Sequence, residues 1–210
     1  LQSFEDPFER HPPKTVIDAF TAEPAGLSPD ELKQRKKVVE KSLQMIKNVR
    51  NLVYASCWHM NPKESAGMWS QYIRSGEGIA VQTTFERLKA SLAGEAYGVS
   101  GAVVQYVDFE TVETKEYNVL AWGALKREES EHEREFRLLA LAGMNPRGFP
   151  VRIDTRGLIE NIYLAPTTPD WIRDLVQAIL LRYEYRVVPI RSELIDGPKY
   201  FEVPEWMRNG

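Results

Sequence analysis

The feature that most restricts the folds open to this chain is a densely charged run at positions 126–137, which leads directly into an apolar stretch. The run reads Lys-Arg-Glu-Glu-Ser-Glu-His-Glu-Arg-Glu-Phe-Arg, and Leu-Leu-Ala-Leu follows it. Placing charges beside a core element costs free energy unless the charges form ion pairs or serve in a functional site. This part of the chain is therefore predicted to hold either ion pairs or a functional site.

The stretch 131–141 fits either a helix or a strand. A helix gives a favourable Glu133–Arg137 pair but an unfavourable Glu131–Glu135 pair, both at a spacing of four. A strand sends alternate side chains to opposite faces. One face would then carry four charged residues, Glu131, Glu133, Glu135 and Arg137. Helix propensity favours the helix, but the glycines and prolines that follow are typical of a hairpin connection. We predict a strand.

Composition narrows the class of protein. The chain has 210 residues, 43% of them hydrophobic, which is ample for a core. A net charge of −3 gives no general attraction to nucleic acid or to a membrane surface, and no apolar run is long enough to span a bilayer. One cysteine, Cys57, cannot form an intramolecular disulfide, which favours a cytoplasmic location. The chain opens on Leu1, so we expect an N-terminal piece to be missing or trimmed.

Strand and helix signals alternate at irregular spacing, which predicts a single α+β domain over 1–210 with a mixed or antiparallel central sheet flanked by helices. Its strongest local signal is Ser28-Pro29-Asp30-Glu31, a capping box that starts a helix reaching about Arg50. The basic face of that helix is interpreted as a solvated surface. We expect residues 1–27 to be an ordered but irregular lead-in with one short helix at Val16–Phe20, and 198–210 to be a loosely packed tail.

Several segments together resemble the bacterial domain-of-unknown-function 2971 family. They are Phe4-Glu5-Asp6-Pro7-Phe8-Glu9, Ser56-Cys57-Trp58-His59, Glu64-Ser65 with Met68-Trp69 and Tyr72, Gly78-Ile79-Ala80, Tyr106-Val107-Asp108, Lys126-Arg127 with His132-Glu133, Glu135 and Arg137, and Ile162-Tyr163 with Ala165-Pro166. Members usually carry a strand and a helix before the first motif, which this chain lacks, and an aromatic where Ser130 stands. Because the family has no established activity, the resemblance implies a site but no reaction.

The candidate catalytic residues are Glu133, Glu135, Arg137 and His59. Two neighbouring carboxylates push their pKa values apart, which suits acid–base work or the stabilisation of a developing cation. A solvated face of ion pairs is the simpler interpretation of the same residues. The candidate ligand-binding residues are Asp6, Glu9, Ser56, Trp69 and Tyr72.

Other residues allow plainer interpretations. Trp69 and Tyr72 share one helical face, which suits either core packing or the wall of a pocket. For Cys57 a buried structural role is preferred to a thiolate paired with His59. A cluster of carboxylates with one histidine could suit Mg²⁺ or Mn²⁺, and the residues that could form it are Asp6, Glu9, His59, Asp108 and Glu133. No spacing in the sequence specifies a metal, and none is assigned.

Two functional hypotheses follow. The first is an enzyme similar to ADP-ribosyltransferases, whose ligand is a small molecule or nucleotide, with NAD as the expected cofactor. In it Glu133 or Glu135 stabilises the ribose of NAD as positive charge develops there. The second is a non-catalytic ligand-sensing or protein-interaction module, in a stress or phage response, in which the acids pair with arginines. Close salt bridges at Glu133 and Glu135, pointing away from any cleft, would favour the module. Convergence of both glutamates with His59 on a pocket would favour the enzyme.

Overall fold

The structure is a computed structural model that describes residues 6–73, 76–94, 98–114, 118–143, 148 and 150–196. The chain divides into two compact units, and each unit combines two separate stretches: residues 1–61 with 95–151, and residues 62–94 with 152–210. The predicted α+β class is confirmed, with small antiparallel and mixed sheets flanked by helices in place of one central sheet. The single-domain boundary stays a prediction, and the tail at 198–210 lies outside the described residues.

The first unit is built around an antiparallel sheet in which β6 (Glu135–Leu141) lies between β1 (Val53–His59) and β3 (Val99–Val103). Two short parallel strands, β4 (Gln105–Val107) and β5 (Leu125–Arg127), pair beside it. The helices of the unit are α1 (Lys14–Thr21), α2 (Pro29–Arg50), α5 (Val119–Trp122) and the 3₁₀ helix η1 (Glu128–Glu133). Its core includes Val53, Leu139, Val16, Phe109 and Trp122, all buried.

The second unit has a three-stranded mixed sheet. Its central strand β7 (Asn161–Leu164) pairs antiparallel with β2 (Ile79–Gln82) and parallel with β8 (Ile190–Arg191). The helices are α3 (Ala66–Tyr72), α4 (Phe85–Ser91), α6 (Thr155–Leu158) and α7 (Asp170–Arg182). Helix α7 packs on this sheet through Val176 and Leu180, which lie in one cluster with Ile162 and Leu164.

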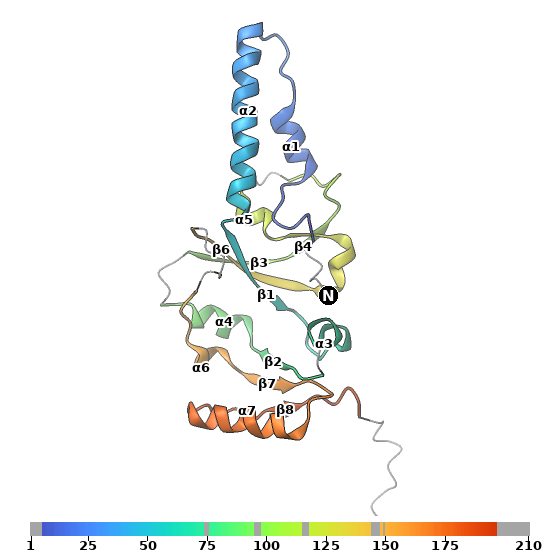
Figure 1. The fold of residues 1–210 in the computed structure, drawn as a ribbon, viewed down its shortest axis with the longest axis vertical. Helices are drawn as coiled ribbons and strands as arrows, with labels where there is room; N and C mark the ends of the chain where they lie inside the picture. Colours follow the sequence, from blue (N-terminus) through green and yellow to red (C-terminus); the bar gives the residue numbers. More distant parts are fainter. Residues whose placement is uncertain are drawn as a thin grey trace, which may run out of the picture. The chain divides into compact units, whose positions relative to one another are not determined.

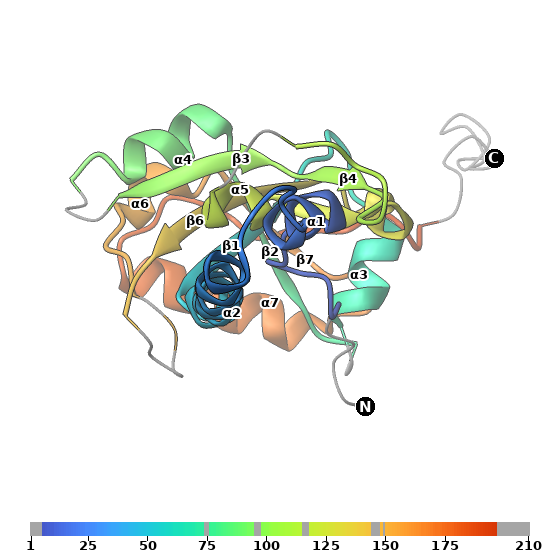
Figure 2. The ribbon, with the colours of Figure 1, turned by 90° about the horizontal axis from the view of Figure 1, so that it is seen from above.

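Helix α2 begins where its capping box predicts. The Ser28 hydroxyl accepts a hydrogen bond from the Glu31 amide at 3.4 Å, and the Glu31 carboxylate accepts one from the Ser28 amide at 2.9 Å. Helix α1 lies beside α2 in both views of the fold (Figures 1 and 2). None of the residues of α2 is buried, so a large part of this long helix remains open to water.

The charged run forms two successive elements, a 3₁₀ helix and then a strand, which corrects the predicted strand over 131–141. Residues 128–133 form η1, and the strand starts only at Glu135. Between them Arg134 takes a left-handed conformation with φ +43°, which ends the 3₁₀ helix and turns the chain into β6. Glu133 and Glu135 are therefore not neighbours on one face of a strand. The prediction that strand alternation brings these two carboxylates together is wrong.

Candidate functional site

The central strand β6 carries buried charges on the same face as the core. Its residues Glu135, Arg137 and Leu139 alternate onto one face of the sheet and are exposed by only 4%, 2% and 1%. The β1 partners of the two charged positions are His59, opposite Glu135, and Cys57, opposite Arg137. Charges this well buried need partners nearby, because an unpaired charge in such a place is expensive.

Those partners come from β5, from η1 and from the N-terminal segment. Lys126 Nζ lies 2.7 Å from a carboxylate oxygen of Glu133 and 3.0 Å from one of Glu135. Arg137 donates from Nε to Glu135 at 2.5 Å and from Nη2 to Glu9 at 2.8 Å. We call these five residues, Glu9, Lys126, Glu133, Glu135 and Arg137, the charge network. It joins four segments of the first unit by charge-assisted hydrogen bonds.

Backbone groups complete the charge network. Arg137 Nη1 donates to the Gly123 carbonyl at 2.9 Å, so this guanidinium has partners on three of its nitrogens. The Glu135 amide donates to the Tyr106 hydroxyl at 2.8 Å, and the Glu135 carbonyl accepts from the Val104 amide at 2.9 Å. Hydrogen bonds from neighbouring strands and from the loop at Gly123 thus help to fix the arrangement of the charge network.

The two cations keep the Glu135 carboxylate ionised. Burial alone would raise the pKa of Glu135. Hydrogen bonds with Arg137 and Glu133, the charge of Arg137 and a hydrogen bond from Lys126 outweigh burial and lower this pKa to about 2. Burial likewise acts to lower the pKa of Lys126, and its hydrogen bonds to Glu133 and Glu135 reverse this and raise it. At neutral pH Glu135 is a carboxylate without a proton to donate, which does not suit a general acid.

The charge network anchors the N-terminal segment. Glu9 reaches Arg137, and three residues earlier the Asp6 carboxylate lies 3.1 Å from Arg127 Nε. Asp6 also accepts a hydrogen bond from the Phe8 amide at 3.0 Å, which closes a turn around Phe8. The Arg127 guanidinium carbon lies 5.2 Å from the centre of the Phe8 ring, a cation–π contact. The two ion pairs thus set the position of Phe8.

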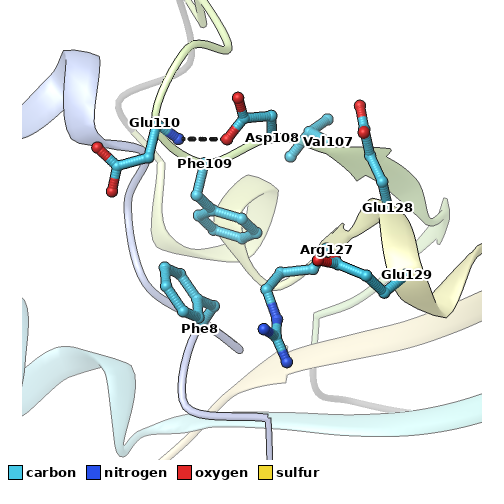
Figure 3. Close-up of a pocket in the computed structure, with 8 residues that line it drawn as sticks. All are labelled: Phe8, Val107, Asp108, Phe109, Glu110, Arg127, Glu128 and Glu129. Carbon is cyan, nitrogen blue, oxygen red and sulfur yellow. Dashed lines mark hydrogen bonds between the residues drawn. The ribbon is translucent and has the colours of Figure 1, made fainter.

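Phe8 forms one wall of a pocket of about 260 Å³ (Figure 3). Its ring centre lies 5.4 Å from that of Phe109, and the two rings are inclined by 55°. In the close-up the two rings lie next to each other, with Arg127 on the side of Phe8 and Asp108 beyond Phe109. The pocket is lined by Phe8, Val107, Asp108, Phe109, Glu110, Arg127, Glu128 and Glu129.

Carboxylates surround this aromatic pair. Asp108 accepts hydrogen bonds from the Glu110 amide at 2.9 Å and the Thr111 hydroxyl at 2.8 Å, and these bonds lower the pKa of Asp108. Glu110 lies 4.0 Å from Lys14 on the surface, a distance at which an exposed pair contributes little. Arg127, the cation that lines the pocket, is already paired with Asp6. The balance of charge around the pocket is therefore negative.

The structure brings together five of the nine predicted site residues. Glu9, Glu133, Glu135 and Arg137 belong to the charge network, and Asp6 pairs with Arg127 next to it. His59 lies at the edge of the network, where its Nδ1 is 2.5 Å from the Glu133 carbonyl oxygen. Its Nε2 is buried without a hydrogen-bond partner among the described residues.

The other three predicted residues are not part of the charge network. Ser56 pairs with Leu138 and faces the opposite side of the sheet from Glu135 and Arg137, because neighbours along a strand alternate. The structure therefore does not bring Ser56 together with the charge network, and its ligand-binding role stays a prediction. Trp69 and Tyr72 belong to α3 in the second unit, and Tyr72 is 66% exposed. The charge network is built from the first unit alone.

Cys57 is exposed, which corrects its predicted burial. Its sulfur nevertheless shares a face with Arg137. Partial loss of hydration raises the pKa of the Cys57 thiol to about 11, helped by Glu135 and opposed by the charge of Arg137. Because the thiolate is the reactive form, this cysteine is a weak nucleophile at neutral pH.

The candidate site residues did not include Lys126 or Phe8, although both belong to segments that carry the family resemblance. Lys126 opens the charged run, is only 6% exposed and contacts both glutamates, yet it was not among the candidate site residues. The available signal was charge balance, since two buried carboxylates require a cation nearby. Phe8 gave no such signal, because its partner Phe109 is far away in the sequence.

Metal ligation and membrane insertion have no support in the described part of the chain. No group of three or more His, Cys, Asp or Glu side chains among those residues is arranged to hold a metal ion. None of the helices found there combines the length and apolarity that crossing a bilayer requires. Comparison with protein-family models, with curated proteins and with solved structures found no significant match. The family resemblance therefore stays a prediction.

Proposed function

We propose that this chain is a non-catalytic binding module and that the charge network is a structural anchor for its ligand pocket. One observation carries the proposal: Glu133 and Glu135 are each engaged by Lys126 or Arg137 at 2.5–3.0 Å, and neither glutamate lines the pocket. A carboxylate that must stabilise a ribosyl cation has to face the space where that cation forms. These two carboxylates face protein cations instead.

The composition of the pocket wall supports a ligand with a positive charge on an apolar body. Phe8, Val107 and Phe109 offer apolar and aromatic surface, and Glu128 and Glu129 extend the acidic rim (Figure 3). Aromatic faces attract cations, and an acidic rim adds to that attraction. An alkyl- or arylammonium group, free or on a side chain of a partner, fits this combination.

Titration calorimetry with phenethylamine tests the proposal, with phenethyl alcohol as its uncharged analogue. We expect the amine to bind and the alcohol to bind at least tenfold more weakly. The double variant Glu128→Gln/Glu129→Gln should weaken amine binding about fivefold or more. Its control, Glu77→Gln/Glu86→Gln, removes two exposed charges from the second unit and should leave binding unchanged. Equal binding of the amine and the alcohol would contradict the assigned ligand class.

The enzyme hypothesis predicts a different result. If the chain were such an enzyme, incubating it with labelled NAD and a cell lysate should transfer the label to a component of the lysate. The variant Glu133→Gln/Glu135→Gln should not transfer it. The binding-module proposal expects no transfer above that of a heat-denatured sample. Label transfer by the wild-type chain that the double substitution abolishes would overturn the proposal in favour of NAD chemistry at the charge network.

A further inference from the structure

Among the residues that the structure describes, part of the apolar face of helix α2 has no packing partner. Val38, Ser42, Met45 and Val49 follow one another at spacings of four, three and four, so they form a single stripe. Val38 is 54% exposed and Met45 66% exposed, although both lie on this stripe. Exposed apolar residues in a row on one helix indicate a contact surface more often than scattered ones do.

The stripe borders a groove of about 290 Å³ in the first unit. Its lining residues come from α1, α2 and α5: Phe20, Ser42, Met45, Ile46, Val49, Val119 and Trp122. Phe20, Ile46 and Val119 pack on the buried cluster that contains Trp122, so the floor of the groove is continuous with the core. The hydrogen bond from Arg35 to the Phe20 carbonyl, at 3.2 Å, ties α1 to α2 along one side.

The charge of α2 differs in sign from that of the whole chain. Seven of its residues are basic and three are acidic, whereas the chain as a whole has a net charge of −3. The basic residues are Lys33, Arg35, Lys36, Lys37, Lys41, Lys47 and Arg50. Lys37 and Lys41 are exposed and precede Met45 at spacings of four, so they continue its row along the helix. The apolar groove thus has a basic border.

From this juxtaposition we propose that the groove between α1, α2 and α5 binds an acidic amphipathic helix of a partner protein. Apolar side chains of that helix would enter the groove, and its acidic face would meet Lys37 and Lys41. Recognition of an amphipathic helix in an apolar groove is an established binding mode, and complementary charge selects the partner and its orientation. The proposal is independent of the ammonium pocket, which uses none of these residues.

Three other occupants fit the surface less well. A second copy would bring two α2 helices with the same positive surplus together, and their charges repel. Nucleic acid would find a basic border, but the aromatic lining residues are the buried Trp122 and the half-buried Phe20, which offer little area for stacking bases. A membrane surface would need a wider apolar face, whereas Ile46 already packs against the core.

Fluorescence anisotropy on the full chain tests the proposal. The probe is a labelled helical peptide of about 18 residues, rich in Glu and Ala, with leucines on one face, and its twin carries Lys in place of Glu. We expect the acidic peptide to bind at least tenfold more tightly than the basic one, and less tightly as salt is raised. Lys37→Glu/Lys41→Glu should weaken its binding about tenfold, and Met45→Asp should weaken it by a similar factor.

The matched control is Lys36→Glu/Lys47→Glu, which makes the same change of charge about half a turn of the helix away from Met45. It should leave binding within about twofold of wild type, and every variant should keep its wild-type circular dichroism spectrum. Equal losses in the two double variants would overturn the proposal. So would tighter binding of anionic phospholipid vesicles or of a single-stranded oligonucleotide, or a dimer in solution that Met45→Asp dissociates.

Discussion

Lys126 is the residue on which the charge network depends most. It lies within 3.0 Å of two buried carboxylates and has little access to water. Removing one partner of a buried pair is more costly than the pair's own net contribution, because the other charge remains buried and uncompensated. Lys126 therefore offsets much of the free-energy cost of burying the Glu133 and Glu135 carboxylates.

Lys126→Met is expected to lower the free energy of unfolding by about 3–5 kcal/mol, measured by urea denaturation at pH 7. The exposed Lys89→Met is the control and should change it by no more than about 0.5 kcal/mol. Glu133→Gln added to Lys126→Met should cost less than the two single changes together, because the residues are in contact. A loss below about 1 kcal/mol for Lys126→Met would show that water reaches the glutamates.

Acid should weaken the fold through Glu135. Because the folded-state pKa of Glu135 is lowered from 4.5 to about 2, its ionisation stabilises the fold above pH 4.5. That contribution is lost as pH falls from 4.5 toward 2. Glu135→Gln lacks it, so we expect the difference in unfolding free energy between wild type and variant to shrink over this range. A difference that stays constant down to pH 2 would contradict the assignment.

The connection between η1 and β6 decides where the acids point. Arg134 takes a left-handed conformation there, which any residue with a Cβ adopts at a cost and a β-branched residue adopts least readily. This single residue separates Glu133, at the end of the 3₁₀ helix, from Glu135, at the start of the strand. Both carboxylates reach Lys126 because the chain turns between them.

Substitutions at Arg134 test this turn. Arg134→Gly should leave stability unchanged or raise it by up to about 1 kcal/mol, since glycine accepts positive φ freely. Arg134→Val should lower it by about 1–2 kcal/mol. Thermal unfolding at neutral pH measures both. Equal effects of glycine and valine would mean that the left-handed turn is absent in solution.

At the scale of the whole chain, sequence reasoning succeeded where signals are local. The capping box of Ser28 and Glu31 predicted the start of α2. The glycines and prolines after the charged run predicted a strand over 131–141, of which the structure has the part Glu135–Leu141. Both depend on neighbouring residues. It failed at η1, because the left-handed turn at Arg134 has no signature in the sequence.

Long-range organisation was also out of reach. Each compact unit combines two separated stretches of chain, and which stretches meet depends on packing that a single sequence does not reveal. The predicted site named Glu9, Glu133 and Glu135, but only the folded chain brings Glu9 to Arg137 and the other two glutamates to Lys126. The pocket likewise requires Phe8 to meet Phe109.

The most direct test is a carbon-13 NMR titration of the Glu135 side-chain carboxyl in the intact chain. If Lys126 and Arg137 hold it as a buried, ionised anchor, its chemical shift stays constant from neutral pH through 4.5 and changes only near pH 2. A midpoint above 4.5, toward neutrality, would show a carboxyl able to exchange protons under working conditions. That result would contradict the structural role and restore the case for catalysis.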